Sequence, residues 1–499
     1  MEPKPVQRDR AAGVLLGQAI GDALGVPYEF RSPVREGGAE MIGGGLGPYA
    51  PGEWSDDSQM AICIAQASAA GGALSSDSDA LNEVARAFID WKNAGATDIG
   101  NQTRDVLGAA EGYAHYGARI GDRSVDEPDF PWAMCCTKEA TDYSAGNPRA
   151  AGNGALMRNG IVGLTRVHDR RATAAAARAV ASLTHADPLA IASCVLHAES
   201  VRVAVLEGHL DPRAGLDLLP ADEQEQWSQW IDEAENGDPM SFSPNGFTVT
   251  AFRAAWSAII STDTGAPGHP TRALQRAVAI GNDTDTVAAI AGALIGARYG
   301  VSGLPWRWRR DVHGWPGLRG TDLISLALQT ALAGIGAPVE AGEWPLAERM
   351  VVETRRLGVA HPADDRVVLG TEADLAHRDE LGCTAVVSLS RVGTAEMQDH
   401  HVVQWLVDSD DPETHADLPI ALHDAADAVV GLVDEGHRVL LHCVRAEHRT
   451  PSVALLYAVK HCGVEPAQAA DDIRKALKVN RIGGLLWSTA MEEAMHHAR

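Results

Sequence analysis

The feature that most constrains this chain is a short acidic segment at the start of an apolar run. Residues 281–286 read Gly-Asn-Asp-Thr-Asp-Thr, and residues 287–298 are small, apolar and helix-prone. The pattern predicts a buried helix with two carboxylates at its first turn. An N-cap accounts for one aspartate, because a capping side chain accepts hydrogen bonds from free amides. The second carboxylate favours a hard cation such as Mg²⁺ or Ca²⁺. This segment alone leaves both interpretations open.

A second predicted helix start repeats this pattern. Residues 54–60 read Trp-Ser-Asp-Asp-Ser-Gln-Met and lead into the apolar segment 61–70. Two helix starts with paired acids in one domain favour a shared metal site over two separate caps. Hard cations bind oxygen ligands, and one or two of them could use the side chains of Ser55, Asp56, Asp57, Asp283, Asp285 and Thr286.

Glycines recur on one face of the first predicted helix, which covers residues 11–26. Gly13, Gly17 and Gly21 are spaced four apart. Each glycine costs about 1 kcal/mol relative to alanine inside a helix. Three at this spacing therefore indicate the close approach of another helix or a ligand. Two single acids follow, whose usual role is a solvated or capping one: Asp22 and Glu29.

Three further segments are weak signals by themselves. Residues 97–101 open a helix, and an ordinary cap is the favoured interpretation there. Residues 152–158 form a glycine-rich turn, whose amides can approach an anion or a sugar. Residues 184–187 end a helix, and a lone histidine such as His185 is more often structural than a ligand.

Length, charge and cysteine content bound the class of protein. A chain of 499 residues predicts two or three domains, and a net charge of −25 argues against a nucleic-acid-binding surface. Seven cysteines without a CxxC pair indicate a reducing compartment. The N-terminus lacks the order of a signal peptide, and no apolar run is long enough to suggest a membrane span. We expect a cytoplasmic protein that does not bind membranes.

Helical patterns dominate the first two-thirds of the chain. They cover residues 79–93, 101–116, 171–183, 188–207, 247–260, 271–280 and 321–334, and strand alternation is absent before residue 340. We predict an all-α domain over residues 1–335 and a linker over 336–364. Strands over 367–370, 384–389 and 439–442 alternate with helices over 373–381, 417–435 and 451–460. This alternation predicts a small α/β domain over residues 365–499.

Five of the segments above, taken in order, resemble the ADP-ribosylglycohydrolase family, which includes the glycohydrolase that reactivates dinitrogenase reductase. They are residues 21–29, 55–57, 152–158, 184–187 and 283–286, and the resemblance spans about residues 8–335. It implies an all-α bundle with a dinuclear Mg²⁺ site (sometimes Mn²⁺). The implied metal ligands are Ser55, Asp56, Asp57, Asp283, Asp285 and Thr286. Family members often have Thr where Ser55 stands, and either hydroxyl can bind a cation.

The resemblance also implies a substrate pocket. Glu29 matches an acidic residue that acts in acid/base chemistry or gating, and Asp98 lies in a segment that approaches the site. The segments matching the ADP-ribose pocket contain Gly152, Asn153, Gly154, Met157 and His185. Cleaving a bond at the anomeric carbon of ribose builds positive charge, and a carboxylate can activate water or protonate the leaving group. Glu29 and Asp56 are the candidates for handling the proton.

The second domain carries a compact motif between its last strand and the following helix. Residues 442–450 read His-Cys-Val-Arg-Ala-Glu-His-Arg-Thr, in which five residues separate Cys443 from Arg449. This is the protein tyrosine phosphatase signature, and residues 366–480 resemble dual-specificity phosphatases. Loop amides and the helix start would hold a phosphate and favour a thiolate at Cys443. Arg449 would bind phosphate oxygens, and Thr450 would help the thiolate leave.

Two points about this motif concern its activity. The family has a general-acid aspartate about thirty residues before the cysteine, where the chain offers Asp408, Asp410 and Asp411, of which Asp411 fits best. The family usually has glycine where Ala446 stands. If this position needs a positive φ, alanine costs about 1 kcal/mol or more.

We therefore expect a Mg²⁺-dependent hydrolase that removes ADP-ribose from a protein side chain or another conjugate, with arginine as the first candidate. The second domain would be a cysteine-dependent phosphatase acting on a phosphorylated substrate. The alternative is a regulatory protein that binds ADP-ribose and whose phosphatase-like domain is a degenerate phosphate sensor. Intact metal ligands favour an enzyme for the first domain, and Ala446 leaves both interpretations open for the second.

Overall fold

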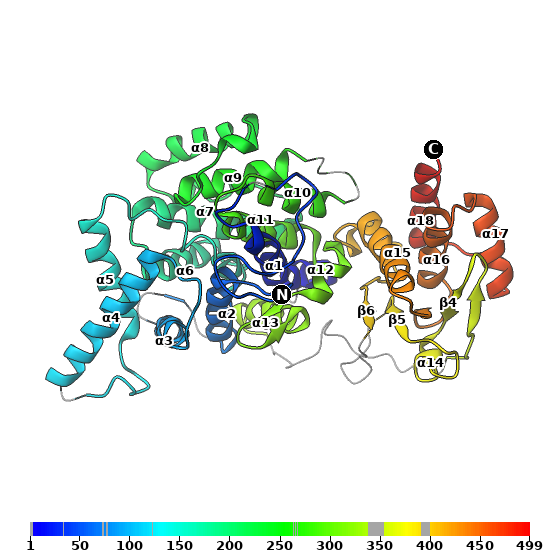
Figure 1. Ribbon diagram of the computed structural model, residues 1–499, viewed down its shortest axis with the longest axis horizontal. Helices are drawn as coiled ribbons and strands as arrows, with labels where there is room; N and C mark the ends of the chain where they lie inside the picture. Colours follow the sequence, from blue (N-terminus) through cyan, green and yellow to red (C-terminus); the bar gives the residue numbers. More distant parts are fainter. Residues whose placement is uncertain are drawn as a thin grey trace. The chain divides into compact units, whose positions relative to one another are not determined.

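A computed structural model shows the chain divided into two units (Figure 1). Unit 1 comprises residues 1–301 and 311–341, and unit 2 comprises residues 302–310 and 342–499. The structure describes residues 3–32, 34–71, 74–75, 78–121, 123–262, 264, 266, 268–337, 354–390 and 400–499.

Unit 1 is built almost wholly of helices. They are α1 (Pro5–Gly25), α2 (Asp56–Ala69), α3 (Asp79–Asn93), α4 (Asn101–Ile120), α5 (Trp132–Gly146), α6 (Arg170–Ser182), α7 (Pro188–Glu207), α8 (Ala221–Asn236), α9 (Thr248–Ile260), α10 (His269–Ala279), α11 (Thr284–Tyr299) and α13 (Gly320–Gly334). A two-residue hairpin, β1 (His313–Gly314) with β2 (Leu318–Arg319), is the strand structure in the described part of this unit. The predicted helices are present, and α5 and α8 are additional to them.

Helices α1 and α11 form the centre of unit 1 (Figure 1). Both are buried over most of their length. A Cβ atom at Gly13, Gly17 or Gly21 would overlap a backbone carbonyl oxygen of α11. The predicted close approach is confirmed, and the partner is a helix. At this contact only glycine on α1 leaves room for the backbone of α11.

The packing of α1 on α11 brings three helix ends together. Thr284 Oγ1 donates to Gly25 O at 2.8 Å, which ties the start of α11 to the end of α1. Gln18 Nε2, on α1, donates to Asp57 O at 3.1 Å, which ties in the first turn of α2. The acidic segments of the sequence therefore meet at one end of the central helix pair.

Helix α7 is long and apolar enough to cross a membrane by length and composition, although we expected no such run. Its most apolar window is 78% buried inside unit 1. Its position among α6, α9 and α11 accounts for the apolar composition, because a helix surrounded by other helices is apolar on all sides.

Unit 2 contains a five-stranded sheet with strand order β3-β4-β7-β5-β6. Its strands are β3 (Val359–His361), β4 (Asp364–Gly370), β5 (Ala385–Ser388), β6 (His401–Val403) and β7 (Val439–His442). Strand β3 pairs antiparallel with β4, and the other neighbours are parallel. The helices are α12 (Trp306–Asp311, of which all but the last residue belong to this unit), α14 (Glu372–Leu375), α15 (Leu418–Asp434), α16 (Arg449–Lys460), α17 (Pro466–Leu477) and α18 (Leu485–His497). Apolar residues cover both faces of the sheet, as expected for parallel strands between helices.

Three details of the domain organisation differ from expectation. Strand β3 and the start of β4 lie within the predicted linker 336–364, of which residues 338–353 are outside the described residues. The helix predicted over 373–381 is only α14, and turns follow it. Residues 302–310 belong to unit 2. There Trp306 fits against Gly431, where a Cβ atom would overlap its ring, and Arg309 pairs with Asp424 at 2.7 Å.

Candidate active site

The starts of α2 and α11 meet the end of α1 in a buried cluster of acids. Asp22 comes from α1, Asp56 and Asp57 from the first turn of α2, and Asp283 and Asp285 from the start of α11. Glu29 follows a short 3₁₀ helix after α1, and Asp98 precedes α4. All except Asp98 are less than 9% exposed. Among the described residues, none of these carboxylates forms an ion pair with Lys or Arg.

The side chains at the two N-cap positions do not cap their helices. Ser55 precedes α2 and Asp283 precedes α11, and neither accepts a capping hydrogen bond. Ser55 Oγ instead donates to Asp22 Oδ1 at 2.7 Å. Asp283 Oδ2 accepts from Asn153 Nδ2 at 2.7 Å. Of the two interpretations of these helix starts, the geometry favours the cation site.

Asp22 is a site residue, although only a solvated or capping role was expected for it from the sequence. Its Oδ1 accepts from the backbone N–H of Ser55 at 2.8 Å, and its Oδ2 accepts from the N–H of Ser58 at 3.0 Å. Asp22 thus caps α2 from the neighbouring helix and fixes the first turn that carries Asp57. Its place inside an otherwise apolar helix was the available signal, because a carboxylate there needs a partner.

The acids form two groups that share Asp285. Ligand atoms of Asp22, Asp57 and Asp285 lie within 4.8 Å of one another, as do those of Glu29, Asp98 and Asp285. Asp57 Oδ1 is buried and has no hydrogen-bond partner. Oxygen atoms packed this closely without cationic side chains have the chemistry of a Mg²⁺ or Mn²⁺ site.

The remaining predicted ligands lie at the same helix starts. Thr286 is 4% exposed in the first turn of α11, and Asp56 is 8% exposed in the first turn of α2. Asp98 is not a cap, because α4 begins at Asn101 with Gly100 as its N-cap residue. The capping role favoured from sequence for this segment therefore does not hold, and Asp98 joins the acidic cluster.

Burial and mutual repulsion dominate the electrostatics of the cluster. Burial raises the pKa values of Asp56, Asp57 and Asp285 well above the ordinary range, and neighbouring carboxylates raise them further. Burial, then the charges of Asp285 and Asp98, raises the pKa of Glu29 to about 12. Such groups hold protons unless positive charge is supplied, so a cation and protons compete for the same oxygens.

A second residue missed from sequence, Asn245, connects the glycine-rich turn to the start of α11. It is fully buried. Its Oδ1 accepts from Asp283 N at 2.9 Å, and its Nδ2 donates to Gly281 O at 3.1 Å. Its carbonyl oxygen accepts from Asn153 Nδ2 at 3.1 Å. The sequence Ser-Pro-Asn-Gly over 243–246 indicates only a turn, so these contacts with α11 could not be predicted.

The glycine-rich turn rests on His185, which is only 2% exposed. A Cβ atom at Gly154 would lie 3.0 Å from His185 Cε1, and one at Gly152 would lie 3.4 Å from Nε2. Burial, then the charge of Arg158, lowers the pKa of His185 to about 3, so the ring is neutral. His185 thus supports the turn from beneath. Met157, also predicted to line the substrate pocket, is 5% exposed.

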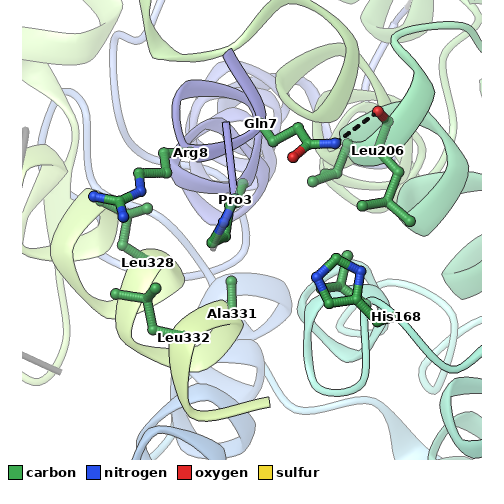
Figure 2. Close-up of a pocket in the computed structure, with 11 residues that line it drawn as sticks. Pro3, Gln7, Arg8, His168, Leu206, Leu328, Ala331 and Leu332 are labelled. Carbon is green, nitrogen blue, oxygen red and sulfur yellow. Dashed lines mark hydrogen bonds between the residues drawn. The ribbon is translucent and has the colours of Figure 1, made fainter. Parts of the chain in front are cut away.

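A separate pocket near the start of α1 is too small for a substrate (Figure 2). Pro3, Gln7 and Arg8 of the N-terminal segment line it together with His168, Leu206 and residues of α13. Its volume is about 10 Å³, which holds at most one water molecule. Gln7 Nε2 donates to Leu206 O at 3.1 Å across it, so the pocket belongs to the packing of α1.

In unit 2, the loop between β7 and α16 surrounds a buried thiol. Cys443 is 2% exposed, and the N–H of Ala446 donates to its sulfur at 3.2 Å. Ala446 has φ +57°, a left-handed conformation that costs alanine about 1 kcal/mol or more. Ala446 thus has the positive φ at which a cost to alanine was expected from the sequence. A hollow of about 260 Å³ opens over the loop and is lined by Asp408, Cys443, Val444, Arg445, Glu447, His448 and Arg449.

The aspartate that lines this hollow is Asp408, whereas Asp411 fitted the spacing best. Asp408 pairs with His448 Nδ1 at 2.8 Å. Asp411 Oδ1 accepts from Glu413 N and caps a short 3₁₀ helix. Sequence spacing could not separate the three aspartates, because the path of their loop decides which carboxylate turns inward.

The two other predicted residues of this site differ in position. Arg449 lines the hollow, and its Nη1 donates to Leu389 O at 3.3 Å and to Leu406 O at 3.2 Å. Thr450 is fully buried in α16 and is not among the lining residues. Its Oγ1 has no hydrogen-bond partner.

Comparisons with known proteins cover the two units to different extents. A family model described as ADP-ribosylglycohydrolase matches residues 3–338. The ADP-ribosylarginine hydrolase Tri1 of Pseudomonas putida is 32% identical over 314 residues, which cover 61% of this chain and 74% of that protein. The ADP-ribosyl-dinitrogen reductase glycohydrolase of Rhodospirillum rubrum is 28% identical over 309 residues, covering 61% of this chain and 90% of that protein. A crystal structure of human DUSP28 aligns with 27% of this chain and 91% of its own, at 18% identity and a TM-score of 0.24.

Proposed function

The chain belongs to the ADP-ribosylglycohydrolase family, and on this premise we propose that unit 1 releases ADP-ribose from modified arginine side chains with the help of Mg²⁺. The observation that carries the proposal is the buried acid cluster at the starts of α2 and α11, where Asp57 Oδ1 has no protein partner. Arginine is the favoured linkage because the relative from Pseudomonas putida carries the name ADP-ribosylarginine hydrolase.

The residues divide into cation ligands and groups that position them. Asp57, Asp283, Asp285, Ser55, Asp56 and Thr286 are the ligands we assign to two Mg²⁺ ions, with Mn²⁺ as a substitute. When bound, the ions supply positive charge that orients ribose hydroxyls and a water molecule. Asp22 fixes the start of α2, and Asn245 fixes the start of α11.

We assign the proton transfer to Glu29, which lies with Asp98 and Asp285 in one of the two groups of acids. Glu29 hydrogen-bonds with Asp98 and has a raised pKa, so it can hold a proton next to the site. A protonated Glu29 can give that proton to the leaving nitrogen as the glycosidic bond breaks. The resulting carboxylate can then take a proton from water. Asn153, within the glycine-rich turn, donates from its Nδ2 to Asp283 Oδ2 at 2.7 Å and so ties this turn to the proposed site.

Release of ADP-ribose from ADP-ribosylarginine tests this proposal. We expect release that stops with EDTA, returns with added Mg²⁺ and falls at least about a thousandfold in Asp283→Ala. The matched control is Asp90→Ala, an exposed acid on α3, which should leave the rate unchanged. Release that survives both EDTA and Asp283→Ala would contradict the metal assignment.

A second function, a cysteine-dependent phosphatase in unit 2, is favoured by one observation. Cys443 and Arg449 line the same hollow, and Asp408 lines it as well. The Cys443 thiolate would attack phosphorus, and the ester P–O bond would break. Asp408 would supply the proton that the leaving oxygen takes up. Water would then hydrolyse the phosphocysteine, releasing inorganic phosphate and restoring the thiolate.

Turnover of p-nitrophenyl phosphate by the full chain tests the second function. We expect release of p-nitrophenol that Cys443→Ser abolishes and that Asp408→Asn reduces about a hundredfold. Cys462→Ser is the matched control, because this cysteine lies outside the hollow. No turnover by the unmutated protein would instead support the alternative of a phosphate sensor.

A further inference from the structure

Two hollows adjoin each other at the Cys443 loop. The first, of about 260 Å³, contains Cys443 and Arg449. The second, of about 560 Å³, is lined by Asp408, Ser409, Asp410, His448, Arg481, Gly483 and Gly484. Asp408 and His448 line both, so the two hollows meet at these residues. A small molecule seated in the first hollow can extend past them into the second.

Each hollow contains an arginine without a carboxylate partner. In the part of the chain that the structure describes, Arg445 in the first hollow and Arg481 in the second form neither an ion pair nor a hydrogen bond. Elsewhere in unit 2, arginines pair with acids in Arg309–Asp424, Arg356–Glu380, Arg366–Asp364 and Arg474–Asp471. In a chain of net charge −25, unpaired guanidinium groups beside a hollow point to an anionic ligand.

Two acids of the second hollow already have partners. Asp408 is paired with His448 at 2.8 Å. Asp410 Oδ1 accepts from the N–H of Leu485 at 2.9 Å, at the start of α18. Neither carboxylate lies within ion-pair distance of Arg481. The guanidinium of Arg481 therefore remains available to a ligand.

We propose that the unit 2 site takes a small phosphate monoester whose scaffold carries a second phosphate. The ester phosphate lies in the hollow of Cys443, and the second phosphate lies at Arg481. This inference rests on the proposed binding of phosphate by unit 2, and it adds the substrate class. A guanidinium binds phosphate through two parallel N–H groups, so Arg481 would select a doubly phosphorylated molecule over a singly phosphorylated one.

Binding to the full chain with Cys443→Ser, which cannot turn the ligand over, tests the inference. The probes are linear alkanediol bisphosphates of three to eight carbons and the alkyl monophosphates of the same lengths, measured by isothermal titration calorimetry. At least one bisphosphate is expected to bind about tenfold or more tightly than its monophosphate. Adding Arg481→Gln should remove this advantage, so that each bisphosphate binds no more tightly than its monophosphate. Arg474→Gln is the control, because Arg474 pairs with Asp471.

The outcomes separate this inference from the phosphatase function. Equal affinity for every matched pair, an advantage that survives Arg481→Gln, or no binding of any probe would overturn the inference. If p-nitrophenyl phosphate is turned over but no bisphosphate is preferred, the phosphatase function stands without this substrate class. If a bisphosphate is preferred through Arg481 but nothing is turned over, unit 2 is a sensor for such molecules.

Discussion

The two sites of this chain are assembled in opposite ways. The unit 1 site draws its acids from the end of α1, the start of α2, the segment before α4 and the start of α11. The unit 2 site is mostly one continuous segment of seven residues, Cys443 to Arg449, which follows β7 and ends at the first residue of α16. A dispersed site depends on the packing of its scaffold, whereas a loop site depends on the conformation of a few residues. Changes far from the chemistry should therefore affect unit 1 more than unit 2.

The largest expected effect comes from Gly21→Ala on α1. The added Cβ would overlap the carbonyl oxygen of Ala288, and the backbone of α11 cannot rotate away. We expect unit 1 to lose about 3 kcal/mol or more of unfolding free energy, measured by chemical denaturation. ADP-ribose release should fall with it, while turnover of p-nitrophenyl phosphate by unit 2 persists.

Gly108→Ala on α4 is the control for this substitution. Nothing lies within 4 Å of a Cβ atom at Gly108, so alanine should stabilise the helix by about 0.5–1 kcal/mol. Equal effects of the two substitutions would mean that the contact between α1 and α11 is not as close as the structure has it.

A smaller loss is expected from Asn245→Ala, which removes the side chain joining Gly281 to Asp283. We expect kcat/KM for ADP-ribose release to fall about a hundredfold, because two buried backbone groups lose their partner and Asp283 shifts. Restoring the amide in part with Asn245→Gln should not rescue the rate, since the longer chain misplaces both bonds. The control is Asn236→Ala, where an exposed amide bonds only within its own helix; a similar loss there would remove the special role of Asn245.

Stability should depend jointly on pH and Mg²⁺ in unit 1. Because the pKa values of Asp56, Asp57 and Asp285 are raised on folding, the folded state binds protons more strongly than the unfolded state. Without a cation, stability therefore falls as pH rises above the unfolded values near 4. Burial raises the pKa of Asp22 to about 6, so this fall should continue through pH 6.

Mg²⁺ should reverse this loss by replacing the protons. At a hundred times its dissociation constant, each bound ion should add about 2.7 kcal/mol near pH 8 and less near pH 5, where protons compete. Differential scanning calorimetry with EDTA or Mg²⁺ at both pH values measures the difference. A stabilisation of equal size at pH 5 and pH 8 would argue against carboxylate ligands.

The smallest expected effect belongs to the loop site. Ala446→Gly removes the Cβ from a residue with φ +57° and should stabilise unit 2 by about 1 kcal/mol. If strain in this loop limits the reaction, turnover of p-nitrophenyl phosphate should rise severalfold. Unit 1 should keep its rate of ADP-ribose release. Loss of stability in Ala446→Gly, followed by urea denaturation, would place the left-handed conformation elsewhere.

The same contrast explains what could be predicted from sequence. Local sequence patterns were sufficient to predict the glycine face of α1 and the motif of Cys443 and Arg449, because each feature lies within one short segment of the sequence. The acids at the starts of α2 and α11 were recognisable because two segments repeat one pattern. Asp22 and Asn245 act through partners that are far away in the sequence, Ser55 and Asp283. The residues next to them in the sequence therefore do not show what they bind.

The roles of residues that depend on the path of a loop could not be predicted from the sequence either. Spacing from Cys443 favoured Asp411, but the loop turns Asp408 toward the hollow and uses Asp411 as a cap. His185 lies beneath the turn of Gly152 and Gly154, and its place in the sugar pocket stays a prediction. In both cases three-dimensional packing decides which atoms of the residue face the site.

The most direct test of the account is the number of divalent ions that unit 1 holds. Asp285 is shared by both groups of acids, so it should be needed for both ions. Electron paramagnetic resonance with Mn²⁺ on the full chain should find two bound ions in the unmutated protein. Asp285→Asn, with an unchanged circular dichroism spectrum, should bind neither ion and release no ADP-ribose. Two ions retained by Asp285→Asn, or ADP-ribose release without any bound ion, would contradict the account.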